Sequence, residues 1–288
     1  MRRSFAVAAF AAVSIVALAA PPLARADLVG EFYARLKGIT TWGAYTAVLE
    51  SRVYETDGSP PPDLASAEIR FPRGAAIRKL FLSKRFYCDP AKLERKPDPR
   101  VCRRSHFGSG ELLLDGRPWI EDGLPADVEL FLGRAESPDA VASVLVLVRS
   151  NDRSPAYDFQ VLRGQLLRDS HGFGYRLVLP TAIRPRLPGL KLRLAELSLT
   201  VRGLRLVRTE RSCASRAASG RCLRSRTRRR SVFWTRTPAC PRARRVTFEA
   251  NYAFEGHDPI VKRRRLNCRR FLRRPSAHRK GTVPGAPA

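Results

Sequence analysis

The chain has 288 residues, of which 54 are lysine or arginine and 26 are aspartate or glutamate, so its formal net charge is +28. This length allows one large domain or two small ones with a real hydrophobic core. The surplus of positive charge favours anionic partners over cationic ones. Past residue 26 no apolar stretch is long enough to cross a bilayer as a helix, so we expect a soluble or surface-associated mature chain.

Residues 1–26 have the pattern of an export signal peptide. Arg2 and Arg3 precede an apolar run from Phe5 to Ala20, and Ala24-Arg25-Ala26 offers a cleavage site with small residues. The apolar run is short for a membrane anchor. We therefore predict an exported chain that is secreted or associated with the cell envelope, with the general and the twin-arginine export routes both open.

The positive charge is concentrated near the end of the chain. Between residues 211 and 274 the sequence has 20 basic and three acidic residues, whereas residues 27–210 have 29 basic and 23 acidic ones. Arginine outnumbers lysine by 46 to eight. A GC-rich coding sequence alone would give this bias, so a solvated arginine-rich surface is an alternative to a binding surface.

Six cysteines in an exported chain predict disulfides rather than a metal site. No cysteine pair has the two-residue spacing of a zinc knuckle, and we predict no metal and no cofactor. The first pair would pin a loop from Ser83 to Phe107, with a single helical turn at Asp89 to Leu93. Fifteen pairings are possible. Spacing favours the sequential one, which joins Cys88–Cys102, Cys213–Cys222 and Cys240–Cys268.

The middle of the chain carries strand patterns. Glu111 to Leu114 ends at Asp115-Gly116, which is a hairpin signal. Val144 to Val148 is apolar without interruption, as expected for a central strand covered on both faces. Tyr157 to Leu167 and Tyr175 to Leu179 are expected to pair across the turn between them.

A phase shift interrupts the leucine-rich stretch that follows. Apolar residues alternate from Leu190 to Leu194 and again from Leu197 to Val201, but the two series are out of phase by one residue. Such a slip would send the second series to the solvent face. A β-bulge at Ala195-Glu196 would return both series to the same face, and we predict one there.

The last quarter predicts two hairpins. Arg211 to Arg230 reads as a polar hairpin tip, and Arg245 to Glu255 alternates strictly before a returning strand at Ile260 to Phe271. We therefore predict an all-β, antiparallel β-sandwich over residues 27–272, with jelly-roll and immunoglobulin-like topologies both open. A disordered basic tail is expected at residues 273–288. The inward row of the alternating strand would be Val246, Phe248, Ala250, Tyr252 and Phe254, and the solvent row Arg245, Thr247, Glu249, Asn251 and Glu255.

A longer motif frames the chain from Phe86 to Cys268. It comprises Phe86, Cys88, Leu93 and Cys102, the turn Ser105-His106-Phe107-Gly108-Ser109-Gly110, then Cys240-Pro241, the aromatic strand Phe248 to Phe254, and Cys268. This motif resembles an uncharacterised family of exported β-sandwich proteins from GC-rich, actinobacterial-type bacteria. The resemblance implies export, the same fold, and the pairings Cys88–Cys102 and Cys240–Cys268, but no catalytic residue. Tyr87 and Arg103 depart from the family pattern, and Cys213 and Cys222 are additions to it.

Residues that could carry catalysis do not form a recognisable arrangement. Asp169-Ser170-His171 has the letters of a hydrolase triad, but adjacent side chains diverge and a hairpin turn explains the same residues. His106, His257 and His278 each stand alone in the sequence. The carboxylates from Asp115 to Glu129 lack the spacing of a calcium loop and are typical of hairpin tips. We therefore predict that this chain is not an enzyme.

Arginines form the candidate binding site. Guanidinium groups suit phosphate and carboxylate ligands, so we expect binding to an anionic wall polymer, an acidic glycan or another polyanion. A secreted glycan or cell-wall hydrolase is one alternative, which a cleft with two facing carboxylates would favour. A structural or assembly partner of other exported proteins is another, with the oligomeric state open. The candidate residues are Arg224, Arg226, Arg228, Arg229 and Arg230 at the predicted hairpin tip, and Arg263, Arg264 and Arg265 on the returning strand.

Overall fold

The computed structural model describes residues 27–37, 46–73, 76–77, 79–151, 158–169, 172–180, 183–202, 205–216, 219, 222–233, 235–236 and 245–267. Its strands are β1 (Leu28–Lys37), β2 (Thr46–Glu55), β3 (Leu64–Phe71), β4 (Ala76–Ile77), β5 (His106–Gly116), β6 (Ile120–Gly133), β7 (Ala140–Ser150), β8 (Phe159–Arg168), β9 (Tyr175–Leu179), β10 (Arg193–Arg202), β11 (Arg205–Arg216), β12 (Cys222–Phe233), β13 (Thr235–Arg236), β14 (Arg245–Phe254) and β15 (Ile260–Asn267). Its helical segments are η1 (Lys79–Phe81), η2 (Lys84–Phe86), α1 (Pro90–Arg95) and η3 (Pro99–Cys102). The prediction of an all-β chain is confirmed.

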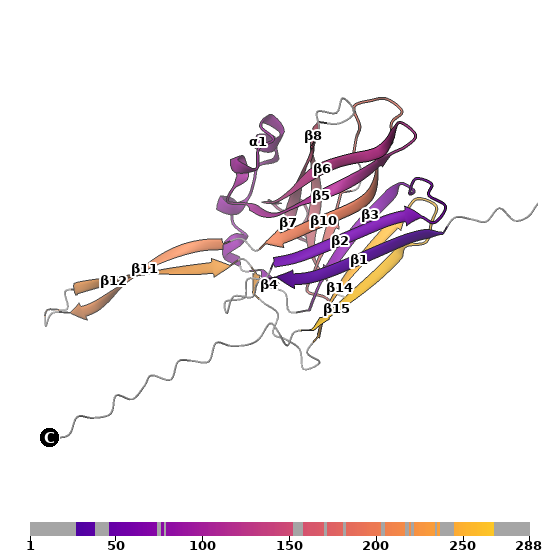
Figure 1. The fold of residues 1–288 in the computed structure, drawn as a ribbon. Coiled ribbons are helices and arrows are strands. Elements are labelled where there is room, and N and C mark those ends of the chain that lie inside the picture. The colour runs from indigo at the N-terminus through magenta and orange to yellow at the C-terminus, as the bar shows by residue number, and fades with distance from the viewer. Residues whose placement is uncertain are drawn as a thin grey trace, which may run out of the picture.

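Eleven strands form one antiparallel sheet in the order β1-β2-β10-β5-β6-β7-β8-β9-β3-β14-β15. The sheet curves so far that its two edge strands, β1 and β15, lie side by side (Figure 1). At this seam a Cβ atom on Gly30 would come within 2.9 Å of Cγ2 of Ile260, so glycine allows the close approach. The sandwich-like arrangement is therefore made by one continuous sheet folded over its own core.

The inward row of β14 is buried as the alternation predicts. Phe248 and Tyr252 are each 1% exposed, and Ala250 is fully buried. The hydroxyl of Tyr252 forms a hydrogen bond with Oγ of Ser51 on β2, which joins strands from opposite parts of the folded sheet. The aromatic row thus closes the core against β2.

The central strand β7 is covered on both faces, which confirms the expectation from its apolar run. Val144, Val146 and Val148 pack into the main core. Leu145 belongs to a second buried cluster with Leu147, Phe131 and the cysteines of the first disulfide. The segment from Lys79 to Arg104, called the cap below, supplies the cover for this second cluster.

The cap is fixed to the sheet by covalent and backbone bonds. The disulfide Cys88–Cys102 lies within it, as predicted from spacing. The backbone N–H of Cys88 donates to the carbonyl of Leu132 at 2.8 Å, which ties the cap to β6. The carboxylate of Asp89 accepts a hydrogen bond from the N–H of Ala91 and begins α1, so the predicted helical turn is confirmed.

The predicted β-bulge is present in β10. Its pairing with β5 shifts register between Leu194 and Glu196, so one residue is left over opposite the partner strand. Leu197 and Leu199 are therefore buried, at 8% and 1% exposure, on the same side as Leu194.

Strands β11 and β12 pair with each other and, among the described residues, with no strand of the main sheet. They form a two-stranded ribbon that stands away from the body (Figure 1). The ribbon carries the disulfide Cys213–Cys222, which confirms the second predicted pairing. The predicted Cys240–Cys268 pairing, the signal peptide and the basic tail lie outside the described residues. No helix in the described part of the chain is long and apolar enough to cross a membrane.

Candidate functional site

The five arginines predicted at a hairpin tip instead lie along a strand. Arg224, Arg226, Arg228, Arg229 and Arg230 all belong to β12, whose backbone pairs with β11 over its whole length. The prediction of a tip was wrong because β11 and β12 extend well beyond the stapled turn, from Arg205 to Phe233. The side chains of these arginines lie outside the described part of the structure.

The ribbon is strongly basic for its length. Its two strands contain nine arginines and one acidic residue, Glu210. Arg228 lies opposite Glu210 in the register, whereas Arg230 lies opposite Arg208. Like charges directly opposite each other on paired strands are destabilising.

The three candidate arginines of β15 have different surroundings. Arg263 donates from Nε to Glu249 on β14 at 2.5 Å, so its charge is shared within the protein. The guanidinium of Arg264 lies 6.0 Å from the ring centre of Tyr33, across the seam between β15 and β1. Arg265 is exposed on the same edge strand. The three residues thus lie together on β15, but Arg263 also has a structural role.

Glu249 corrects the prediction that its row of β14 faces solvent. The residue is 1% exposed, because Arg70 of β3 and Arg263 of β15 cover it from both neighbouring strands. Arg70 also contacts Asp169, whose side chain is fully buried, at 3.3 Å. Asp169 therefore belongs to an ion-pair network, while Ser170 and His171 lie outside the described residues.

Of the carboxylates singled out between Asp115 and Glu129, Asp115, Asp127 and Glu129 each contact a different basic residue. Burial alone would raise the pKa of Asp115, but hydrogen bonds from Arg117 outweigh it and leave the pKa below its usual value. Glu129 contacts His106 at 2.6 Å across the β5–β6 pair, so the view of His106 as a solitary residue was wrong. Within the described residues, no group of three or more histidine, cysteine or acidic side chains is placed to hold a metal ion.

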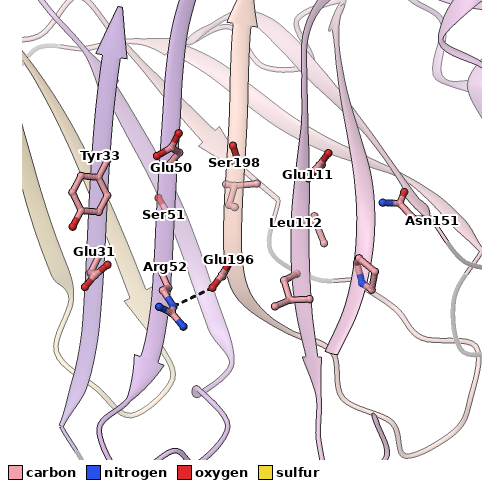
Figure 2. A pocket seen from close by; sticks show the side chains of 13 residues that line it. Glu31, Tyr33, Glu50, Ser51, Arg52, Glu111, Leu112, Asn151, Glu196 and Ser198 are labelled. Atoms are coloured by element: carbon pink, nitrogen blue, oxygen red, sulfur yellow. Dashed lines mark ion pairs between the residues drawn. The ribbon is translucent and has the colours of Figure 1, made fainter. Parts of the chain in front are cut away.

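A groove on the outer face of the sheet was not predicted from the sequence. It crosses β1, β2, β10 and β5 and has a volume of about 560 Å³ (Figure 2). Four glutamates line it, together with a tyrosine, an arginine, a serine and an asparagine at one end. They are Glu31, Glu50, Glu111, Glu196, Tyr33, Arg52, Ser198 and Asn151.

Register places the groove's charges in rows across the strands. Arg52 lies between Glu31 and Glu196 and contacts Glu196 at 3.0 Å (Figure 2). In the next row Ser198 lies between Glu50 and Glu111. The alternation along each strand indicates that these residues face outward. Which of them become neighbours depends on the order of the strands in the sheet, and that order could not be predicted from the sequence.

Comparison with family models, curated proteins and solved structures gives no match to this chain. The resemblance to a family of exported β-sandwich proteins therefore stays a prediction from the motif.

Proposed function

We propose that this chain is an exported, non-catalytic protein that binds an anionic polymer of the cell envelope by electrostatic attraction. The observation that supports this most directly is the β11–β12 ribbon, with nine arginines and one glutamate on two strands that pair only with each other among the described residues. The proposal also includes Arg264 and Arg265, two exposed arginines of the edge strand β15.

Several arginines outside the β11–β12 ribbon have carboxylate partners within the protein. Arg35, Arg52 and Arg186 each contact a carboxylate within 3.0 Å, so their charge is offset inside the protein. The two strands of the ribbon supply only one carboxylate, Glu210, for their nine arginines. The positive charge of the ribbon is therefore available to phosphate or carboxylate groups of a polymer, whose binding would release condensed counterions.

The location implied by this proposal is extracytoplasmic. Cys88–Cys102 and Cys213–Cys222 lie at bonding distance, which is typical of proteins in an oxidising compartment. A polymer with repeated anionic groups can contact several arginines of the ribbon at once, which supports a polymer over a small anion as the ligand.

Binding of the oxidised chain to heparin and to isolated wall polymer tests the proposal. A ribbon variant with Arg228, Arg229 and Arg230 changed to serine should lose about ten-fold or more in affinity. The matched control changes Arg35, Arg52 and Arg186 to serine, which removes the same charge from the body and should alter affinity less than about three-fold. Equal losses in both variants would contradict a role for the ribbon.

A secreted glycan hydrolase is the second candidate, and the outer groove supports it. Glu50 and Glu111 flank Ser198, so their Cα atoms are two strand spacings apart, or about 9 to 10 Å. The two carboxyls of inverting glycosidases are about 6.5 to 9.5 Å apart, a separation that outward-facing glutamates at this Cα spacing can reach. Tyr33, 51% exposed, lies opposite Glu50 and offers a ring on which a sugar can stack.

Release of reducing sugar from wall polymer tests this second candidate. Glu50→Gln and Glu111→Gln should each abolish release, while Glu31→Gln in the same groove should leave most of it. Absence of release by the unmodified protein from a panel of wall polymers would exclude the hydrolase and leave polymer binding as the function.

A further inference from the structure

The cap is a second cationic surface that the charge distribution of the sequence conceals. From Lys79 to Arg104 the cap has nine basic residues and three acidic ones, a net charge of +6. This equals the whole surplus of residues 27–210, so the rest of that region has as many acidic as basic residues. The positive field outside the last quarter of the chain therefore belongs to the cap.

A groove of about 610 Å³ lies between the cap and the turn that joins β6 to β7. Lys84 of η2, Lys92 of α1 and Arg134, directly after β6, line it. All three side chains belong to exposed residues. Three cations from three separate elements thus border one hollow, which is the arrangement that an anion requires.

The two acidic residues of this groove already have partners. Asp89 is the N-cap residue of α1, and its carboxylate accepts a hydrogen bond from the N–H of Ala91 at 3.1 Å. Glu136 contacts Arg163 at 3.0 Å. Because Arg163 offsets the charge of Glu136, the groove keeps a positive balance toward a ligand.

The groove is prebuilt, since its walls are fixed on both sides. Phe86 and Leu93 anchor η2 and α1 with 4% and 0% exposure, and Cys88–Cys102 closes the loop that contains α1. The opposite wall consists of Arg134, Ala135 and Glu136 in the β6–β7 turn, together with Ser143 and Leu145 of β7, a strand in the centre of the sheet. An anion would therefore bind without ordering a flexible loop first.

Tyr87 adds an uncharged donor to the groove. Burial raises the pKa of its phenol, while Arg134 acts in the opposite direction. The net increase keeps the hydroxyl protonated through the physiological range, where it can donate a hydrogen bond.

We propose that the groove formed by Lys84, Tyr87, Lys92 and Arg134 is a binding site for a phosphate group of a phosphodiester polymer. The donors here are two ammonium groups, a guanidinium and a phenol from separate elements. The two non-bridging oxygens of a tetrahedral phosphodiester accept hydrogen bonds from several directions, whereas the lone pairs of a planar carboxylate lie in one plane, so this set of donors suits the phosphodiester better. The inference rests on the proposed function and deepens it, because it gives polymer binding a defined contact beside the diffuse charge of the ribbon. It also names phosphate as the ligand chemistry.

Titration with glycerol 3-phosphate and with inorganic phosphate tests the site, because these probes are too small to reach both groove and ribbon. The groove variant changes Lys84, Lys92 and Arg134 to serine and should weaken binding of both probes about ten-fold or more. The matched control changes Lys96, Arg100 and Arg103 to serine, which removes the same charge from other parts of the cap and should cost less than about three-fold. Equal thermal unfolding of both variants would show that the cap remains folded.

The outcomes separate this site from the ribbon. If the ribbon variant loses heparin while the groove variant binds glycerol 3-phosphate like the unmodified protein, the groove inference is wrong and the proposed function stands. If groove and control variants lose phosphate equally, only the general field acts and the site is likewise overturned. If the groove variant loses binding to vesicles of phosphatidylglycerol but not to the soluble phosphates, the ligand is a membrane surface rather than a polymer phosphate, which also contradicts the proposal.

Discussion

Arg263 of β15 donates from Nε to the carboxylate of Glu249 on β14, and Arg70 of β3 contacts the other oxygen of the same carboxylate at 2.7 Å. Glu249 is thus held between two guanidiniums from the strands on either side, with its side chain only 2% exposed. An arginine that sequence reasoning assigned to ligand binding is therefore part of what fixes the last hairpin of the sheet.

Glu249→Gln should destabilise the fold by about 2 to 4 kcal/mol, because it leaves the largely buried Arg70 without its nearest counter-charge there. Arg263→Gln should cost less than about 1 kcal/mol, since that side chain is 66% exposed and solvent replaces the contact. Urea unfolding of both variants measures the difference. Equal losses would mean that the network does not depend on burial.

The buried hydroxyl of Tyr252 should make stability fall at alkaline pH. Burial raises its pKa to about 12, while the hydrogen bond with Ser51 acts in the opposite direction. The unfolded state, with a tyrosine pKa near 10, loses its proton first, so unfolding becomes easier as pH rises between the two values. The contribution is fully present below about pH 10, and about 2 to 3 kcal/mol should be lost by pH 12.

Tyr252→Phe is the control for this pH dependence. It should cost about 1 to 2 kcal/mol at pH 7, because Ser51 loses its partner in the core. Above pH 10 its stability should fall less steeply than that of the unmodified protein. Parallel curves for the two proteins from pH 9 to pH 12 would exclude Tyr252 as the titrating group.

The bulge in β10 predicts an asymmetry between two single-residue deletions. Removing Ala195 takes away the extra residue and leaves Leu194 and Leu197 on the core side, so the sheet should keep its fold. Removing Ser198 instead turns Leu199, now 1% exposed, toward solvent. Thermal unfolding followed by circular dichroism should show a far larger loss for the second deletion, and a reversed order would contradict the register.

Local patterns in the sequence predicted much of the fold. Period-two alternation placed Phe248 and Tyr252 in the core, and a one-residue phase slip located the bulge beside Glu196. Spacing identified Cys88–Cys102 and Cys213–Cys222, since short loops close most readily. Each of these features depends on residues close together in the sequence.

Features that depend on distant strands were not predicted. Glu249 lies on the outward row of its strand, and only the pairing of β14 with β3 brings Arg70 over it. The outer groove needs β10 between β2 and β5, although the three strands are far apart in the chain. The cationic cap was missed for another reason, since averaging the charge over residues 27–210 spread its surplus of six over a long and otherwise neutral stretch.

The central claim is that the ribbon binds an anionic polymer by electrostatic attraction. The most direct test measures how binding to duplex DNA, a polyanion of known charge density, depends on salt concentration. If the five candidate arginines of β12 contact phosphates, the logarithm of the association constant should fall with the logarithm of salt concentration with a slope of about −4 or steeper. A variant with Arg224, Arg226, Arg228, Arg229 and Arg230 changed to serine should reduce that slope by about 4. A slope near zero for the unmodified protein, or the same slope for both proteins, would contradict electrostatic polymer binding by the ribbon.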